Sequence, residues 1–470
     1  MLPRRFGPNV LTSYLSTVVS TVQVLVITPV IVHGLGAERY GIWSLVVSLG
    51  VFTILLDMGL ASGTTRYVAH YEELGERVRV ARAVTVSFWI LLALGTLALL
   101  VGTVLALLFP HLFRVPAGEE ESASVLVVLV TAATAITIVG GAFQGCLAGL
   151  MRYSALNLIR IVAVVVQATA FAVCIWLGGQ LVALGLALLV VTLAEMIARY
   201  VAVRRLLPDL KLSRRFVDPG FASEIVKMSA WISSTQIATA LRYRVDTIVV
   251  GLVVGVRAAG VYAVGQLLFV AAERFIRPIT TGIFPLSAEL AGRHDAEGLR
   301  VAVITGTRIS LAVAGPLCLA GILLAGPLVD AWIGPGFEDA RVVIAYLLSA
   351  LLLAQVSRAG FVMLQGSGSV KAPAAILWAE ALLNLALSLI LGLVFGLTGV
   401  ALATLIATAA VSTAVGVPYM CSAFGIPVSS FAVSLTRAHA PPIGVAILTR
   451  WILSPGENAS LVVVLAAGAG

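Results

Sequence analysis

Long apolar stretches recur along the whole chain and are separated by short segments rich in arginine, glycine and acidic residues. A run of about 20 apolar residues is long enough to cross a hydrocarbon core of about 30 Å as a helix. Polar and apolar residues do not alternate within these runs, which disfavours a barrel of transmembrane strands. The twelve predicted spans are 8–32, 41–68, 84–109, 124–149, 157–178, 180–203, 225–253, 258–286, 302–328, 342–365, 373–395 and 398–420.

Composition supports the same fold class. The 470 residues are 60% hydrophobic and 11% charged, with a mean hydropathy of +1.07. A soluble protein carries about 25% charged residues. We therefore predict an all-α polytopic membrane protein. Residues 438–470 hold two shorter apolar pieces, so the predicted number of transmembrane helices is 12 to 14.

The distribution of arginine and lysine between the predicted loops indicates the orientation. With the N-terminus inside, nearly all loop cations lie on the cytoplasmic side, and the outer segments hold Arg39, Arg114, Arg257 and Arg341. An excess of positive charge marks cytoplasmic loops. We therefore expect a multi-pass protein of the cytoplasmic (inner) membrane with a cytoplasmic N-terminus. The longest inner connection lies near the middle of the chain.

The two halves on either side of this connection resemble each other. "ERYGIWSLV" (38–46) is similar to "AAGVYAVGQ" (258–266), and "FQGCLAGLMRYSALN" (143–157) is similar to "FVMLQGSGSVKAPA" (361–374). Repeats with an even number of spans share one orientation, a pattern typical of transporters. We predict four regions: a six-helix bundle at 1–203, a cytoplasmic connection at 204–224, a second six-helix bundle at 225–420, and a C-terminal loop with possible helices 13 and 14 at 421–470.

A segment of the first half resembles a known family. "GLGAERYGIWSLVVSLGVFTILLDMGLASGTTRYVAHYEELGE" (34–76), with "DTIVVGLVVGVRAAGVYAVG" (246–265) and "WIGPGFEDA" (332–340), is similar to polysaccharide-biosynthesis flippases. These belong to the multidrug/oligosaccharidyl-lipid/polysaccharide transporter superfamily. The resemblance covers residues 8 to about 420. It implies two pseudo-symmetric bundles around a central cavity, alternating access, and a cavity lined by the first two helices of each half.

The resemblance also implies a substrate and partners. The substrate would be a polyprenyl-diphosphate-linked oligosaccharide, moved from the cytoplasmic to the outer leaflet for O-antigen, capsule or exopolysaccharide synthesis. Its partners would be membrane lipids and the glycosyltransferases and polymerase of the same pathway. We expect a monomer that binds no nucleic acid, and neither a cofactor nor a metal ion beyond a coupling H⁺ or Na⁺.

Arginine outnumbers carboxylate within the spans of the second half. Charged residues inside a membrane usually face a cavity or a partner. Either they form salt bridges that fix helix packing, or they line a positively charged cavity. Because arginine binds phosphate through two forked donors, the excess favours a diphosphate site. The candidate substrate-binding residues are Arg244, Arg274, Arg242, Arg277, Arg66, Arg308 and Arg358.

The i, i+4 spacing predicts two pairs within single helices, Arg242 with Asp246 and Glu273 with Arg277, which leaves Arg244 and Arg274 for the substrate. Glu195 and Glu380 are lone carboxylates in spans. Either one binds a coupling H⁺ or Na⁺, or it forms a hydrogen bond between helices. The candidate coupling-ion sites or charge partners are Asp57, Asp246, Glu273, Glu195 and Glu380.

A bend is predicted at "RPITTG" (277–282), because Pro278 removes a backbone hydrogen bond and Gly282 follows four residues later. This bend would form a gate or shape the cavity.

Two other functions remain as alternatives. A cation-coupled multidrug exporter of the same superfamily would need a carboxylate-rich cavity, which the arginine excess disfavours. A membrane glycan polymerase or glycosyltransferase would need a large outer loop with paired carboxylates or a metal site, and the predicted outer loops are short. The chain contains no phosphate-binding nucleotide motif, which disfavours an ATP-driven pump. We expect a transporter with no catalytic residues.

Overall fold

The computed structural model describes residues 6–50, 59–208, 210–213 and 219–436. Across these residues the secondary structure is helical and contains no strand. The predicted all-α class is therefore confirmed. The proposed helices 13 and 14 fall mainly outside the described residues.

The helices form two compact units, Met1–Leu267 with Leu385–Val400, and Leu268–Asn384 with Ala401–Gly470. The boundary at Leu267 and Leu268 lies inside the helix Val256–Thr281, and the predicted connection at 204–224 stays a prediction. The helices Pro219–Arg244 and Asp246–Val253 pack on helices of the first part of the chain. Gly41 lies so close to the backbone of Val256 that a Cβ at Gly41 would be 2.3 Å from the carbonyl oxygen of Val256.

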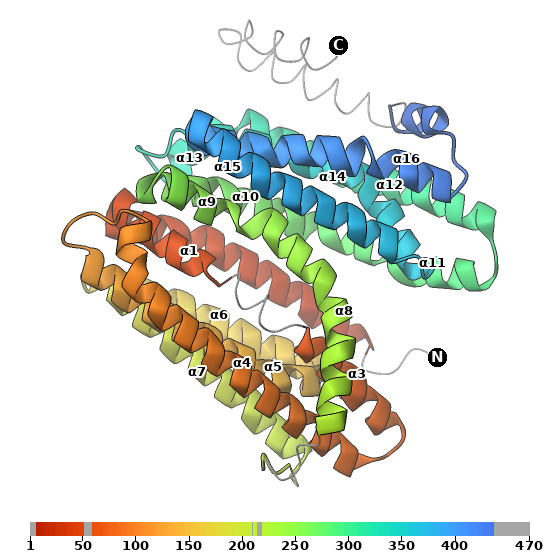
Figure 1. Cartoon of the computed structure of the whole chain (residues 1–470), viewed down its shortest axis with the longest axis horizontal. Coiled ribbons are helices and arrows are strands. Elements are labelled where there is room, and N and C mark those ends of the chain that lie inside the picture. The colour runs from red at the N-terminus through yellow and green to blue at the C-terminus, as the bar shows by residue number, and fades with distance from the viewer. Residues whose placement is uncertain (1–5, 51–58, 209, 214–218, 437–470) are drawn as a thin grey trace, which may run out of the picture. The chain divides into compact units, whose positions relative to one another are not determined.

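The helices of the N-terminal half lie alongside one another in the first unit (Figure 1). α5 packs between α4, α7 and α3, while α6 packs on α1 and α7. The elements up to residue 253 are α1 (Phe6–Ser48), α3 (Leu60–Glu73), α4 (Arg77–Leu112), α5 (Glu120–Gly149), α6 (Tyr153–Trp176), α7 (Leu181–Leu206), α8 (Pro219–Arg244) and α9 (Asp246–Val253).

The second half contains longer helices interrupted by short ones. In the second unit α14 packs against α12 and α11. The elements are α10 (Val256–Thr281), α11 (Ile283–Gly292), α12 (Ala296–Leu323), α13 (Ala325–Trp332), α14 (Ala340–Gly366), α15 (Lys371–Ala407), the π-helix η2 (Thr408–Thr413) and α16 (Gly416–Ala423).

Two of these long helices are each bent at one glycine. Gly36 in α1 has φ 77° and ψ 168°, and Gly396 in α15 has φ 62° and ψ −142°. Positive φ is accessible to glycine without the clash that a Cβ would cause. Each bend falls in the short gap predicted between two spans, at 32–41 and at 395–398, so α1 and α15 each contain parts of two predicted spans.

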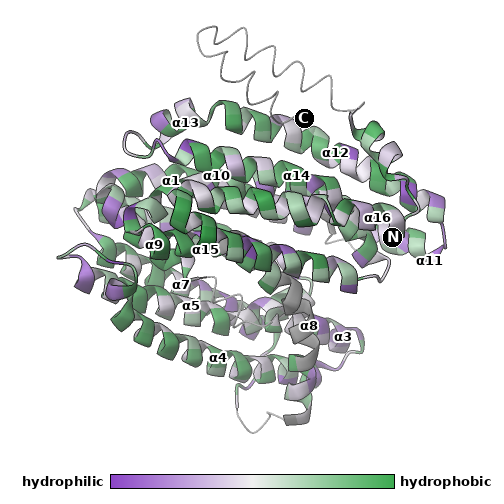
Figure 2. Ribbon diagram, turned by 45° about the horizontal axis from the view of Figure 1, so that its top comes forward, coloured by the Kyte–Doolittle hydropathy of each residue, from purple (hydrophilic) through white to green (hydrophobic). Residues whose placement is uncertain are grey.

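Apolar surface and length both fit a membrane. Nine helical segments in the described part of the chain are long and apolar enough to cross one. Large apolar side chains such as Leu107, Trp176 and Leu393 are more than 70% exposed, as expected for residues that face lipid. Figure 2 shows hydrophobic residues along most of α4.

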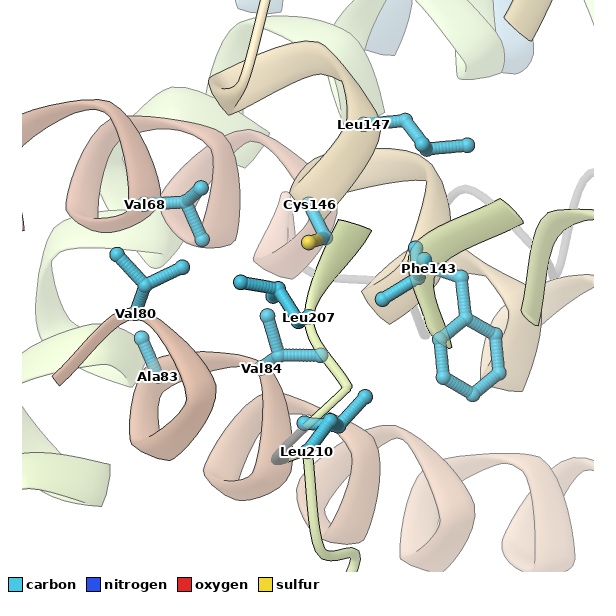
Figure 3. Close-up of a cluster of buried hydrophobic side chains, with 10 residues drawn as sticks. Val68, Val80, Ala83, Val84, Phe143, Cys146, Leu147, Leu207 and Leu210 are labelled. Carbon is cyan, nitrogen blue, oxygen red and sulfur yellow. The ribbon is translucent and has the colours of Figure 1, made fainter. Parts of the chain in front are cut away.

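The core of the first unit surrounds the end of α5 that leads into the 150–152 loop (Figure 3). Phe143, Cys146 and Leu147 of α5 contact side chains of α3, α4 and the segment after α7. Cys146 is completely buried, which agrees with a packing role for this thiol. The other members of the cluster are Val68, Val80, Ala83, Val84, Val203, Leu207 and Leu210.

Candidate functional site

The carboxylate of Asp246 lies at a break in the helical backbone. The predicted single span 225–253 is divided at Val245, so α8 ends at Arg244 and α9 begins at Asp246. This corrects the expectation that Arg242 and Asp246 lie on one continuous helix. The break places Asp246 in the first turn of α9, where the helix dipole stabilises a negative charge.

Asp246 is surrounded by polar groups and is almost inaccessible to solvent. Asp246 is 2% exposed, and its carboxylate accepts hydrogen bonds from the hydroxyls of Tyr262 at 3.0 Å and Ser388 at 3.5 Å. Arg242 is buried as well. Tyr262 and Ser388 come from α10 and α15, so three helices meet at this carboxylate.

Glu273 of α10 pairs with a different helix from the one predicted. Its carboxylate lies 3.2 Å from the guanidinium of Arg358 on α14, and both side chains are partly buried. Arg274 is half-buried and Arg277 is exposed. The ion pair of Glu273 therefore joins two helices. In the second unit, α10 and α14 carry four arginines, Arg274, Arg277, Arg341 and Arg358, and one glutamate.

The remaining predicted arginines are dispersed. Arg66 on α3 is exposed, and Arg308 on α12 is exposed with its Nε donating to the carbonyl of Ser434 at 3.3 Å. Arg244 is the last residue of α8, and its side chain lies outside the described residues, as does Asp57.

Near the bend predicted at Pro278, the helix assignment changes from α10 to α11 at Gly282, whose backbone stays in the right-handed helical region with φ −64° and ψ −21°. α10 continues through Pro278 to Thr281, and α11 starts at Ile283. The N–H of Gly282 donates to the carbonyl of Pro278 at 3.0 Å. A gating role for this point stays a prediction.

Glu195 is not a lone carboxylate. It accepts a hydrogen bond from Arg199 one turn later on α7, and its second oxygen lies 3.5 Å from Arg160 of α6. Glu195 and Arg199 are each 10% exposed at the side chain, and Arg160 is 51% exposed. These three residues form an ion triad that joins α6 to α7.

Glu380 on α15 is fully buried. Its carboxylate accepts hydrogen bonds from Thr408 at 2.7 Å and from Ser412. Both hydroxyls belong to η2, and a π-helical turn is a frequent feature of functional sites. The bonds join the part of α15 before Gly396 to the part of the chain after it.

A known family matches most of this architecture. The family described as "Polysaccharide biosynthesis protein" matches residues 6–291, which include the segment 34–76 and the Asp246 and Glu273 regions. The chain belongs to this family. The MatE family matches residues 232–390. The resemblance seen in the sequence is therefore confirmed.

A curated relative is the uncharacterized membrane protein EpsK of Bacillus subtilis (strain 168). The two are 26% identical over 350 residues, which cover 71% of this chain and 65% of EpsK. The chain thus matches slightly less than two thirds of that relative's length.

Solved structures share the fold at low identity. A multidrug resistance MATE family transporter of the MOP superfamily, in an inward-facing conformation, has a TM-score of 0.75 at 16% identity, covering 87% of this chain and 95% of that one. The lipid II flippase MurJ, in an inward closed conformation, has a TM-score of 0.68 at 14% identity, covering 97% and 99%. The first of these structures is of a transporter and the second of a flippase, and the likeness shows that this chain shares their fold.

Several polar residues of these sites were not predicted. Glu195 and Arg199 have the same i, i+4 order as Glu273 and Arg277, and this spacing indicates a pair on one helix face. Arg160 lies inside a predicted span and should have signalled a partner. Tyr262, Ser388, Thr408 and Ser412 carry no sequence signal of this kind, because hydroxyls are common in membrane helices.

Proposed function

We propose that this protein flips a polyprenyl-diphosphate-linked oligosaccharide from the cytoplasmic to the outer leaflet of the cell membrane. The observation that carries the proposal is the family match over residues 6–291. The likeness in fold to a lipid II flippase supports it. Arg274 and Arg277 on α10 and Arg358 on α14 supply the chemistry, because guanidinium groups bind phosphate through two forked donors and keep their charge when water is removed.

Transport of a labelled lipid tests this function. The full-length protein would be reconstituted in liposomes with a polyprenyl-diphosphate-linked disaccharide that carries a fluorophore. We expect the protein to speed the appearance of the label at the outer face, as measured by quenching with an impermeant reductant. Empty liposomes and liposomes containing fluorescent phosphatidylcholine serve as controls. A rate equal to that of empty liposomes would contradict the proposal.

A second candidate function is cation-coupled drug export. The MatE match at residues 232–390 and the fold of a multidrug transporter favour it. The same liposomes loaded with a lipophilic cationic dye separate the two functions. A drug exporter would move the dye and leave the lipid-linked disaccharide in place.

The orientation proposed here places the N-terminus and the connection 204–224 in the cytoplasm. The clustering of arginine and lysine on this side supports it. Protease cleavage within 204–218 in inside-out membrane vesicles, and not in right-side-out vesicles, would agree with this orientation.

Glu380 is a candidate site for the coupling H⁺ or Na⁺. The change Glu380→Gln should abolish the stimulation of transport by a pH or Na⁺ gradient, because an amide neither ionises nor carries the charge that a cation needs. The protein should still fold, since the hydroxyls of Thr408 and Ser412 can both donate and accept. Gradient-driven and gradient-free transport would be compared in the same liposomes.

Glu297 provides the control for this change. It is exposed and pairs with Arg300 at 3.6 Å, so Glu297→Gln should transport like the wild type. If Glu380→Gln keeps its full response to the gradient, the coupling carboxylate lies elsewhere or transport is uncoupled.

A further inference from the structure

A polar cavity of about 490 Å³ lies between α5, α6 and α7 in the first unit. This volume falls within the roughly 300–1,000 Å³ typical of small-molecule sites. Each helix presents one stripe to the cavity, at the 3–4-residue spacing of one helix face. The stripes include Thr137, Gly140 and Gln144 on α5, Arg160, Ala163 and Gln167 on α6, and Thr192, Glu195 and Arg199 on α7.

Several groups that line this cavity have hydrogen-bonding capacity to spare. Gln144 and Gln167 make no hydrogen bond within the described part of the chain, and Nε of the buried Arg199 has no partner there. Arg160 is half-exposed, and its ion contact is the loose one to Glu195 at 3.5 Å. Buried polar groups are normally satisfied, so a polar ligand would supply the partner that Nε of Arg199 lacks. The exposed Gln144 and the half-buried Gln167 are accessible to the same ligand.

The third amide of the lining, Asn157, has another role. Its side chain donates to the hydroxyls of Thr12 at 3.2 Å and Ser13 at 2.9 Å on α1. These bonds hold α6 against α1 and therefore support the stripe that carries Arg160. The α6 side of the cavity is therefore held in place by hydrogen bonds to α1, while Gln144, Gln167 and Nε of Arg199 keep donors available for a ligand.

The charge of the cavity decides which ligand suits it. The charged residues that line it are Arg160, Glu195 and Arg199, which sum to a formal charge of +1. A diphosphate carries about two negative charges, too many for this balance, whereas a single carboxylate matches it. The free amides of Gln144 and Gln167 match sugar hydroxyls, because a carboxamide both donates and accepts.

We propose that this cavity binds a uronic acid residue of the transported glycan, with Arg160 holding the sugar carboxylate and Gln144 and Gln167 its hydroxyls. The inference rests on the proposed function and specifies a class of substrate for it. Arg160 lies seven residues after the start of α6, and Arg199 lies seven residues before the end of α7. Each is therefore about 10 Å from that end of its helix, and the start of α6 and the end of α7 lie on the same side of this antiparallel pair. With the predicted orientation this is the cytoplasmic half, where the glycan is loaded.

Ligand binding to the full-length protein in lipid nanodiscs tests the inference. The probes are D-glucuronate, D-glucose and acetate, measured by saturation-transfer difference NMR. We expect glucuronate to bind about ten- to a hundredfold more tightly than glucose, since glucose lacks the charge-assisted bond. Acetate should also bind more weakly, because it cannot reach the amides.

Two variants place the binding in this cavity. Arg160→Gln should lower the affinity for glucuronate to that for glucose, and it should fold, because Arg199 remains beside Glu195. Gln144→Leu combined with Gln167→Leu should weaken glucuronate binding without affecting acetate. Arg293→Gln is the control for loss of one positive charge, since Arg293 is exposed and pairs with Glu289 at 2.7 Å in the second unit.

The outcomes separate this inference from the proposed function. If Arg160→Gln binds glucuronate like the wild type, or if acetate binds as well as glucuronate, the cavity is not a uronic acid site. That result would leave the proposed flipping of the lipid-linked oligosaccharide standing. If the Arg160-dependent binding is found but no lipid-linked disaccharide is flipped, the cavity stands as an acidic-sugar site and the proposed function fails.

Discussion

Replacing Arg274 by alanine is expected to slow flipping of the lipid-linked glycan about ten- to a hundredfold, the loss that follows when one charge-assisted hydrogen bond of about 1.5–3 kcal/mol is removed. Arg274 is half-buried on α10, next to Glu273. The carboxylate of Glu273 lies 3.2 Å from the guanidinium of Arg358 on α14. We propose that Arg274 binds the diphosphate through its forked donors, and we expect Arg244→Ala to act in the same way.

Arg274→Lys distinguishes binding geometry from charge alone. A lysine keeps the charge but cannot place two forked donors on two phosphate oxygens, so it should recover only part of the rate. Arg293→Ala, at an exposed ion pair of the same unit, should leave the rate unchanged. Rates would be measured in the liposome assay at equal amounts of reconstituted protein. If Arg274→Ala and Arg244→Ala both flip the lipid at the wild-type rate, these arginines serve packing.

Replacing Gly145 by leucine is expected to prevent correct folding of the first unit. A Cβ at this position would lie 2.5 Å from the carbonyl oxygen of Ala61 and 2.8 Å from Cβ of Thr64. α3 therefore packs directly on the backbone of α5, as small residues in membrane helices allow. Thr64 cannot yield easily, because its hydroxyl bonds to Leu60 at 2.7 Å and to Ser87 of α4 at 2.7 Å.

The expected cost of Gly145→Leu is at or above the upper end of the roughly 1–3 kcal/mol typical of overpacking. The measurement is the yield of monodisperse protein in mild detergent, together with the thermal unfolding midpoint. Gly315→Leu is the matched control, because nothing lies within 4 Å of a Cβ at Gly315 in the middle of α12. A Gly145→Leu protein with the yield and midpoint of the control would show that α3 can move away from α5 without loss.

The sequence alone was enough to predict the fold class, most helices and the family. The gaps predicted at 32–41 and 395–398 contain the two bends at Gly36 and Gly396. These features are local, because a span is set by the apolar character of about 20 consecutive residues. The break at Val245 was not predicted, since 225–253 contains no proline and its one glycine, Gly251, comes after the break.

The partners of the buried charges were decided by the tertiary structure. Glu273 meets Arg358 across 85 positions, Glu195 meets Arg160 of another helix, and Glu380 meets Thr408 and Ser412 beyond the bend in α15. The i, i+4 rule applies only to neighbours on one face of a single helix, so it cannot predict pairs between helices.

The rotation of each helix about its axis decides which other residues come within reach. In a membrane this rotation leaves little trace in the sequence, because lipid is as apolar as the protein core and the hydrophobic pattern does not mark the inner face. The sequence by itself therefore determined which segments are long and apolar enough to cross a membrane and which family they form. Packing between helices decided which charges pair and where the cavity between α5, α6 and α7 lies.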